Sequence, residues 1–562
     1  MGKARFCAPV VLVIGLALVV SGTSAAAASV PVPAVEIDGE PALLSSPLRW
    51  ADGSLLITIE DLARCLDANF DWNDDQTVWM TKYGNTFLFH LARSGEVLKN
   101  SEPIALPVKA RSTGGKLYLP LRFVAENLGA TVIWDASAYK VRIITGKRRI
   151  PPERIGERAF EAVIAFTDQE KLWLLDGRKP KAEPKQVTDS GSVQICGWSQ
   201  DGNWLAYKQS VKGEDEWYLW VIAAQGSEAR LVDTDPVHGD ILWSPQGNCL
   251  IYTVRSEKDA ANTIKHAEIR PDEIYPNTIA ITEAAVLSWA WHPDGDSIAI
   301  SYPRTETQPP RIERLDLNGN SRNLYTYYDS EPVDPEFNTW AIISLKWSSD
   351  GQHLAYHLRK NSGSLTADAV ETEVLDLRSG QAISLRAGLK YPNWMAFSPS
   401  GDKFAYIAGT GRDVVVNKEL ELLDLAAQVS SDCGQDGYVD SQPVWLPTGE
   451  LIYCRGTEAK VAADFNTLPK VMVPKQRVQI LNAKGQTRPL TAGPSATADY
   501  YPTPSPAGDE MIFLRLERFD QGSLYIQSLA RPEPAVEIVR GLRGSPGYYG
   551  NYYPQWISVH WF

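Results

Sequence analysis

The chain has 562 residues, of which 44% are hydrophobic and 22% charged, an ordinary composition for a globular protein. Its formal net charge of −13 argues against nucleic acids and anionic membranes as partners, because both call for basic patches. The length allows two to four domains, and 41 glycines and 37 prolines suit a β-protein rich in turns.

Residues 1–28 have the pattern of a secretory signal sequence. Lys3 and Arg5 give a positive start, residues 9–20 form an apolar stretch that is short for a membrane span, and small residues follow at 24–28. The alternative is an N-terminal anchor that is not cleaved. We therefore expect a protein that is secreted or held at the cell surface, with no membrane contact beyond that anchor.

Residues 36–146 contain an internal duplication. The second copy runs from Gly115 through an apolar helix face and ends in two strands; the first copy begins at Gly53 and has the same order. Each copy is predicted to be strand, short amphipathic helix, strand, turn, strand. The apolar face of the second helix recurs at i, i+3, i+4 and i+7, in Leu121, Val124, Ala125 and Leu128.

This duplicated unit resembles the copper amine oxidase N-terminal-like domain, also called the stalk domain, of exported bacterial proteins. The family's Pro-Leu-Arg signature is present at Pro120-Leu121-Arg122, whereas the first copy has Thr58-Ile59-Glu60 there. The resemblance implies a small α+β domain without catalysis. His90 is its only histidine, so no copper site is expected.

A polar, proline-containing linker is predicted at residues 147–158, and residues 159–562 are predicted to form one large repeat domain. A motif of an aromatic residue, a four-residue turn of the Ser-Pro-Asp-Gly kind and an apolar triplet recurs about every 50 residues. Its copies begin at Trp198, Trp243, Trp291, Trp347, Phe397 and Trp445, with a degenerate copy at Pro504-Ser505 and a truncated one at Trp556.

Each repeat is predicted to hold four antiparallel strands, because the motif marks a hairpin and two further strands follow it. Proline presets φ in the turn, and glycine takes the position that needs a positive φ. Four strands per repeat around a ring make a β-propeller. The repeats resemble the TolB-type, WD40-like and prolyl-oligopeptidase-like propellers, which implies a mainly β fold but not a function.

The two ends of the repeat domain are predicted to share one blade. Residues 160–190 match strands two to four of a repeat but lack a first strand, and the segment around Trp556 resembles a first strand. This predicts eight blades; the alternative is seven. Closure would remove the exposed sheet edges that invite aggregation.

No catalytic motif is present in the sequence. It contains no Gly-x-Ser-x-Gly elbow, His-Glu-x-x-His pair, phosphate-binding loop or dinucleotide fingerprint, and the repeats run to the chain end, so no hydrolase domain is expected. The cysteines show no metal spacing and no disulfide framework, so Cys196, Cys249 and Cys454 are interpreted as small apolar residues. The acidic turns at Asp201, Asp294 and Asp350 are interpreted as turn formers and not as calcium sites.

Two hypotheses for the function follow. The first is a monomeric, non-catalytic envelope binding or scaffold protein without cofactor or resident metal, whose propeller engages a protein, a peptide or a glycan. The second is a polysaccharide lyase or hydrolase with a metal in the propeller channel, held by His238, His353 or His357.

The long connections between strands two and three, and between successive repeats, fall on one face of the propeller. Long loops on a rigid scaffold are where function concentrates. The ligand is therefore expected on that face, and the residues predicted to contact it are Trp217, Trp340, Arg412, Tyr500 and Tyr501.

Overall fold

The chain divides into two compact units, residues 1–149 and 150–562, each described here by itself. The computed structural model describes residues 32–38, 40–66, 68–74, 77–82, 85–90, 96–99, 102–128, 130–136, 138–145, 151–210, 216–255, 262–282, 286–305, 307–328, 341–359, 369–459, 472–531, 533–544 and 556–562. The signal sequence expected at residues 1–28 lies outside these ranges. Among the described residues, neither helix is long and apolar enough to cross a membrane.

The first unit has the predicted duplicated order. The first copy contributes β4 (Ser54–Thr58), α1 (Ile59–Leu66), β5 (Asn69–Asp74) and β6 (Thr77–Lys82), and the second contributes β11 (Lys116–Pro120), α2 (Leu121–Asn127), β12 (Thr131–Asp135) and β13 (Lys140–Ile144). The remaining strands are β1 (Ala34–Ile37), β2 (Glu40–Pro41), β3 (Arg49–Ala51), β7 (Asn85–His90), β8 (Glu96–Lys99), β9 (Glu102–Ile104) and β10 (Arg111–Thr113).

One core joins the two copies of this unit. β4 and β11 pair antiparallel, with Ile57 opposite Leu119, and both helices pack their apolar faces into the same cluster. The predicted face of α2 is confirmed, since Leu121, Val124, Ala125 and Leu128 are all buried. Asp61 on α1 is buried as well and accepts hydrogen bonds from the backbone of Ser45 and Ser46, which fixes the segment before β3.

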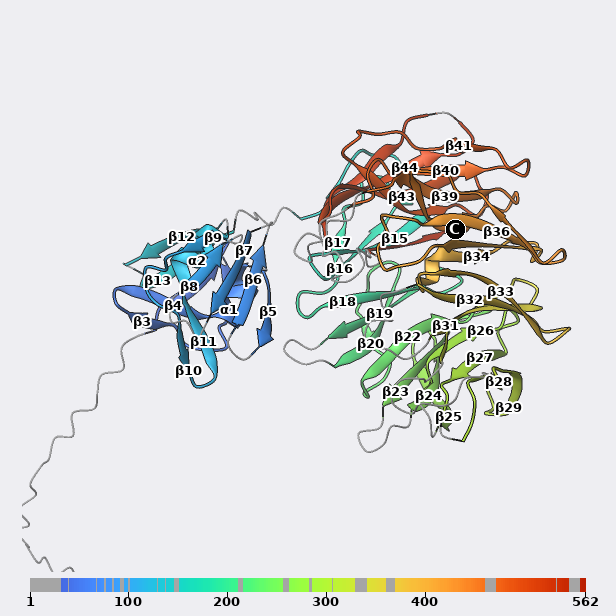
Figure 1. Ribbon diagram of the computed structural model, residues 1–562, viewed down its shortest axis with the longest axis horizontal. Coiled ribbons are helices and arrows are strands. Elements are labelled where there is room, and N and C mark those ends of the chain that lie inside the picture. Colours follow the sequence, from blue (N-terminus) through green and yellow to red (C-terminus); the bar gives the residue numbers. More distant parts are fainter. Residues whose placement is uncertain are drawn as a thin grey trace, which may run out of the picture. The chain divides into compact units, whose positions relative to one another are not determined.

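The second unit is built from eight sheets (Figure 1). The sheets are numbered 1 to 8 in chain order, and sheets 2 to 7 each consist of four consecutive strands. Sheets 2 to 4 are β18 (Val193–Trp198), β19 (Trp204–Ser210), β20 (Trp217–Ala223), β21 (Arg230–Leu231); β22 (Val237–Trp243), β23 (Cys249–Arg255), β24 (Asn262–Ile269), β25 (Ile274–Thr282); and β26 (Ser288–Trp291), β27 (Ser297–Tyr302), β28 (Arg311–Asp316), β29 (Ser321–Thr326).

Sheets 5 to 7 follow the same order. They are β30 (Ala341–Trp347), β31 (His353–Arg359), β32 (Val370–Asp376), β33 (Gln381–Gly388); β34 (Met395–Phe397), β35 (Lys403–Ala408), β36 (Glu419–Asp424), β37 (Val429–Asp432), preceded by the short 3-10 helix η1 (Pro392–Trp394); and β38 (Tyr438–Trp445), β39 (Leu451–Thr457), β40 (Arg477–Leu481), β41 (Thr487–Pro489). One repeat of the sequence therefore corresponds to one sheet.

Sheets 8 and 1 contain the ends of the unit. Sheet 8 holds β42 (Ala498–Pro504), β43 (Glu510–Arg518), β44 (Gln521–Ser528) and β45 (Val536–Arg543), and β14 (Glu153–Arg154) adds to its edge. Residues 153–154, expected in a linker, are thus paired with β45. Sheet 1 holds β15 (Ala162–Asp168), β16 (Lys171–Asp176), β17 (Lys185–Gln186) and, from the other end of the chain, β46 (Ile557–Trp561).

The position of the last repeat differs from the prediction. β46 pairs antiparallel with β15, with Trp561 opposite Ala162, so the residue that ends this first strand is Trp561 and not Trp556. The sequence prediction placed the copy at Trp556 because no turn follows Trp561 to mark the register. Each sheet contacts the next in order, and sheet 8 also contacts sheet 1 through β45 and β15.

The repeated tryptophans join neighbouring sheets. Each lies at the end of a first strand and donates its indole N–H to a backbone carbonyl in the first strand of the preceding sheet. The bonds run from Trp198 to Ser558, Trp243 to Gly197, Trp291 to Leu242, Trp347 to Ala290, Trp445 to Ala396 and Trp561 to Thr503, at 2.8–3.2 Å. The motif therefore connects sheets as well as forming hairpins.

We expect Trp347→Phe to lower the free energy of unfolding by about 0.5–1.5 kcal/mol, because it removes the indole hydrogen bond to the carbonyl of Ala290 while preserving an aromatic ring. Chemical denaturation followed by circular dichroism measures this. Trp220→Phe, at a half-buried tryptophan on β20 outside this set, is the control. Equal losses in both variants would show that ring size, and not the indole bond, matters.

The turn glycines follow the prediction with one exception. Gly202, Gly295, Gly351, Gly401, Gly449 and Gly508 all have φ between 67° and 82°. Gly247 is not among the glycines with positive φ, so the turn after Trp243 does not need glycine for that reason. Turns of neighbouring sheets also contact one another. Gln246, in the turn after Trp243, donates a hydrogen bond of 2.9 Å to the carbonyl of Pro293, in the turn after Trp291.

Candidate functional site

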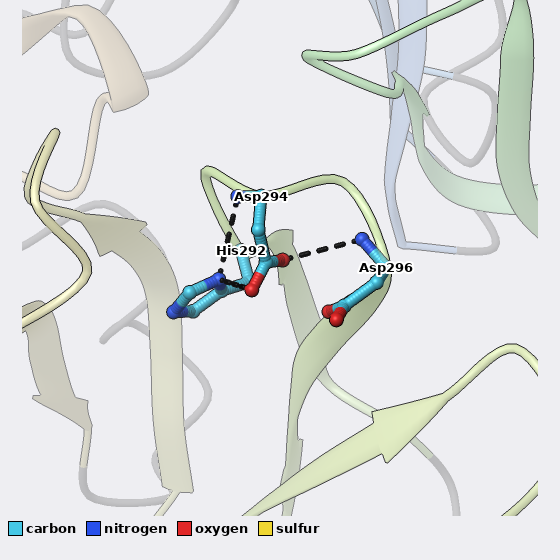
Figure 2. A group of neighbouring side chains, drawn as sticks. All are labelled: His292, Asp294 and Asp296. Carbon is cyan, nitrogen blue, oxygen red and sulfur yellow. Dashed lines mark hydrogen bonds and ion pairs between the residues drawn. The ribbon is translucent and has the colours of Figure 1, made fainter.

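Among the described residues, one group of histidine and acidic side chains is close enough to share a metal ion. It consists of His292, Asp294 and Asp296, in the turn between β26 and β27 (Figure 2). Gly295 at φ 74° tightens this turn, and its N–H donates to the carbonyl of His292 at 2.9 Å. The sequence prediction interpreted Asp294 as a turn former and did not anticipate that the turn gathers all three side chains.

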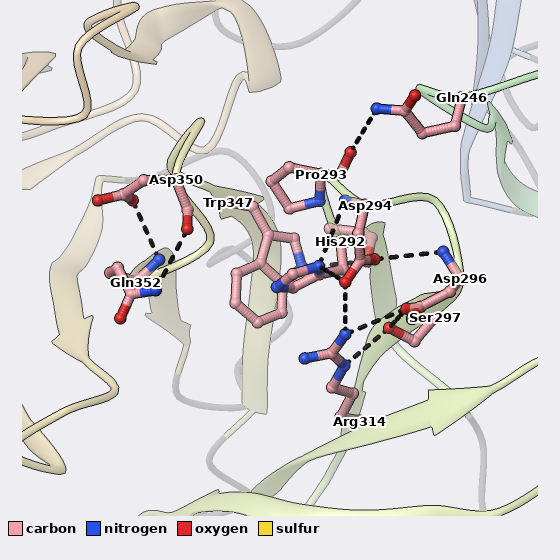
Figure 3. Close-up of polar contacts among 11 residues, drawn as sticks. Gln246, His292, Pro293, Asp294, Asp296, Ser297, Arg314, Trp347, Asp350 and Gln352 are labelled. Atoms are coloured by element: carbon pink, nitrogen blue, oxygen red, sulfur yellow. Dashed lines mark hydrogen bonds and ion pairs between the residues drawn. The ribbon is translucent and has the colours of Figure 1, made fainter.

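A guanidinium group already neutralises these carboxylates (Figure 3). Arg314 on β28 lies 2.9 Å from Asp294 and 3.1 Å from Asp296 through Nη2, and its Nε donates to Ser297 at 2.7 Å. His292 Nδ1 lies 2.7 Å from Asp294 Oδ2. A metal ion would have to displace Arg314 and break the bond between His292 and Asp294.

The imidazole of His292 also has a packing role. Its ring meets Trp347 edge to face, with centroids 4.7 Å apart, and Gly351 of the next turn lies against it. Burial raises the pKa of Asp294, but the hydrogen bonds from Asp296 and His292 outweigh it and bring that pKa to about 2. The group is therefore best explained as an ion-pair cluster that holds the turns of sheets 4 and 5 together.

The depressed pKa predicts a pH-dependent contribution to stability. Because the folded pKa of Asp294 lies below the ordinary value of about 4, its contribution is present above pH 4 and is lost as the pH falls toward 2. We expect Asp294→Asn to reduce stability at pH 7 by no more than about 1 kcal/mol, since solvent screens this partly exposed pair. Thermal melts at pH 7 and pH 2 should show the difference shrinking at pH 2; a difference that persists at pH 2 would contradict the assignment.

The structure distributes the predicted ligand-binding residues over several sheets. Trp217 lies on β20 of sheet 2, half-buried, with Lys208 Nζ 6.0 Å from its ring centroid. Arg412 is half-buried in the connection between β35 and β36 of sheet 6. Trp340 lies outside the described residues. These residues are therefore not brought together into one cluster, and their contact with a ligand stays a prediction.

Tyr500 and Tyr501 on β42 are buried, with 5% and 7% of their surface exposed. The hydroxyl of Tyr500 accepts a hydrogen bond from the backbone of Val473, and the backbone N–H of Tyr501 donates to Gln442. A β-bulge turns both side chains into the core, since the register of β42 shifts after Tyr500 and Tyr501 has φ 55°. Both rings therefore pack in the core and expose little surface to a ligand.

Buried charges on the connections were not anticipated from the sequence. Lys418 is fully buried, and its ammonium donates to the carbonyls of Thr410 and Val416 at 2.9 and 3.0 Å. Desolvation lowers the pKa of Lys418 to about 8. The sequence gives no sign that Lys418 is buried, because a lysine before an apolar strand is usually exposed. The burial depends on how the connection of residues 409–418 folds over its side chain.

Two buried Asp–Arg pairs occupy equivalent places in sheets 7 and 8. Asp440 faces Arg455 across β38 and β39, with contacts of 2.6 and 2.7 Å, and Asp499 faces Arg515 across β42 and β43, with contacts of 2.7 and 2.9 Å. Each guanidinium also binds a carbonyl of the connection before its sheet. The two pairs thus fasten residues 433–437 and 490–497 to the strands.

The histidines proposed for a channel metal do not gather. His357 is buried on β31, and burial lowers its pKa to about 4. His353 lies on the same strand opposite Asp376, and His238 lies on β22 of a different sheet. None of the three belongs to a group of three possible metal ligands among the described residues. The five described cysteines form no disulfide.

Comparisons with known proteins agree with the two-part architecture. Residues 36–143 match the family model described as the copper amine oxidase N-terminal domain. A curated relative, Dipeptidyl-peptidase 5 of Porphyromonas gingivalis, is 26% identical over 291 residues, which cover 49% of this chain and 40% of that protein. The chain thus spans well under half of the length of this relative.

Solved structures that are similar to this chain include TolB of Acinetobacter baumannii, with 16% identity, a TM-score of 0.31 and coverage of 66% of this chain and 79% of that one. Dipeptidyl peptidase 4 of Porphyromonas gingivalis has 12% identity, a TM-score of 0.42 and coverage of 69% and 59%. The resemblance predicted for the duplicated unit is confirmed by the family model.

Proposed function

We propose that this chain is an exported, non-catalytic binding protein whose second unit is a closed, eight-bladed propeller that takes a peptide or an extended protein segment. The succession of eight sheets, the pairing of β46 with β15 and the contact of β45 with β15 support the closed ring. The positive start and apolar stretch of residues 1–28 support export.

The buried charges that anchor the connections carry the proposal for binding. We call the face formed by the second-to-third connections and the connections between sheets the loop face. The desolvation free energy lost when an ion pair is buried is rarely exceeded by the Coulombic attraction within the pair. Buried ion pairs are therefore poorly explained by a contribution to stability alone. Lys418, Asp440–Arg455 and Asp499–Arg515 all hold loop-face segments in place. Loops held rigid by a scaffold are what a preorganised binding surface requires.

The opposite face has fewer side chains available to bind a ligand. It carries the short turns, whose side chains are engaged with neighbouring turns, as in the bond from Asn248 to Asp201 at 2.8 Å and from Ser349 to the carbonyl of Pro399 at 2.9 Å. The name of the curated relative favours peptides over glycans as the ligand class. Arg412 on the loop face is the residue that we expect to contact such a ligand.

A peptidase-like activity is the alternative that the same relative favours. Against it, the sequence lacks a Gly-x-Ser-x-Gly elbow. The lyase or hydrolase hypothesis with a channel metal has less support, since His238, His353 and His357 do not converge.

Peptide arrays probed with the purified full chain test the proposal. We expect Arg412→Glu to weaken binding to the selected peptides at least tenfold, whereas Arg378→Glu, an exposed charge reversal in a short turn after β32, should leave binding unchanged. Circular dichroism checks that both variants fold. Loss of binding in Arg378→Glu alone would place the ligand on the face of the short turns and contradict the proposal. Release of shortened peptides would favour a peptidase activity.

A further inference from the structure

Sheet 3 places a thiol beside an imidazole. Cys249 Sγ, at the start of β23, lies 3.5 Å from His266 Nδ1 on β24. Glu268 is directly opposite Cys249, and His266 is opposite Ile251, so all these side chains share one face of the sheet. Cys249 and His266 are half-buried and Glu268 is exposed, which leaves the group open to solvent.

We propose that Cys249, His266 and Glu268 form a site for a zinc-class divalent cation. Thiolate, imidazole and carboxylate are the ligands that Zn²⁺ uses, in a tetrahedron with a Zn–S bond of about 2.3 Å and a Zn–N bond of about 2.0–2.1 Å. Two such bonds at a tetrahedral angle separate sulfur from nitrogen by about 3.5 Å. The thiol and imidazole therefore already stand at the spacing of two ligands on one zinc ion.

The Glu268 carboxylate does not lie within 4.8 Å of both the thiol and the imidazole, so it must change rotamer to become the third ligand. Directly opposed residues of an antiparallel pair have Cβ atoms about 5 Å apart, so the Glu268 carboxylate can turn toward Cys249. Glu268 now pairs with Arg270, but both side chains are about half exposed, at 49% and 55%. The guanidinium holds the carboxylate through two hydrogen bonds, of 3.1 and 2.8 Å, which a metal ion would have to break.

The surroundings of the pair are those of a metal site on a sheet face. Cys249 packs against an apolar cluster that also contains Ile251, Leu242 and Leu317. Binding must displace the proton of the Cys249 thiol: one Cys249–S–metal bond forms, one S–H bond breaks, and the proton is released to solvent.

The other described cysteines lack such a partner. The thiols of Cys196 and Cys433 face backbone carbonyls, and that of Cys454 faces Gln442. Cys196 is a matched control, because it is also half-buried and lies in the neighbouring sheet 2. The His292 cluster is a second control, since its three possible ligand atoms lie close together but its two carboxylates are bound to Arg314.

Titration of the purified full chain with Co²⁺, followed by Zn²⁺ competition, tests the site. We expect a thiolate-to-cobalt charge-transfer band with one-to-one stoichiometry, release of one proton per ion, and loss of the band on addition of Zn²⁺. Cys249→Ser should abolish the band and His266→Asn should weaken binding at least tenfold, whereas Cys196→Ser and His292→Ala should leave it unchanged.

Other outcomes would overturn the proposal. They are an absent charge-transfer band in the folded wild-type chain, a band that survives Cys249→Ser, or a band that is lost in Cys196→Ser or His292→Ala. Glu268→Gln serves as a further probe: weaker binding with the band retained supports the carboxylate as third ligand, and unchanged affinity removes it from the site.

Discussion

Removal of residues 556–562 should destabilise the second unit more than any other short deletion. The segment buries Trp556, Ile557 and Trp561, which expose 2%, 1% and 8% of their surface. It also holds the acceptor for Trp198 and the indole that binds the carbonyl of Thr503. Burial of three large apolar side chains is worth about 5–9 kcal/mol, so the melting temperature should fall sharply.

The same deletion exposes the edge of β15, which offers unpaired backbone groups to other chains. We therefore expect self-association as well, visible in analytical ultracentrifugation. Deletion of Phe562 alone, a residue that is 47% exposed, is the control and should leave the protein monomeric. If the longer deletion melts like the full chain and stays monomeric, β46 is not a structural part of sheet 1.

Arg515→Ala should lower the free energy of unfolding by about 3–5 kcal/mol. The substitution leaves the Asp499 carboxylate buried without its cation and removes the hydrogen bond to the carbonyl of Ala492. Arg518→Ala on the same strand is the matched control, because its pair with Asp520 is exposed and worth less than about 1 kcal/mol. Urea denaturation of the two variants measures the difference.

The double variant Asp499→Leu with Arg515→Met separates the cost of an unpaired charge from the value of the pair. Because two apolar side chains replace both charges, we expect the double variant to be more stable than Arg515→Ala. A double variant that is as unstable as Arg515→Ala would show that the pair itself, together with its bonds to the connection, stabilises sheet 8.

The repeat period and turn chemistry were enough to predict the four-stranded sheets, because the residues that mark the hairpin lie close together in each copy. The place of Trp198 at the end of a first strand follows from the Ser-Gln-Asp-Gly turn behind it. Its indole bond to Ser558 does not follow, since the acceptor lies at the other end of the chain. Trp561 was missed for a related reason: its hairpin partner β15 lies at the beginning of the unit.

The candidate sites were harder to predict because they depend on contacts between distant residues. The sequence drew attention to Asp294, but Arg314, which neutralises the carboxylates of this group, lies on β28, the second strand after β26. Alternation along a strand would leave one of Tyr500 and Tyr501 exposed, and the bulge in β42 buries both. Cys249 and His266 have no motif spacing and meet only through the register of β23 and β24.

One measurement tests the central claim, that the propeller binds a peptide without changing it. Peptides selected on the arrays are incubated with the full chain at a concentration near that of the protein. They are then recovered, and their masses are measured by mass spectrometry. The account predicts saturable binding and recovery of every peptide at its original mass. Peptides recovered with two residues or any other segment removed, in proportion to protein and time, would contradict it and make the chain a peptidase.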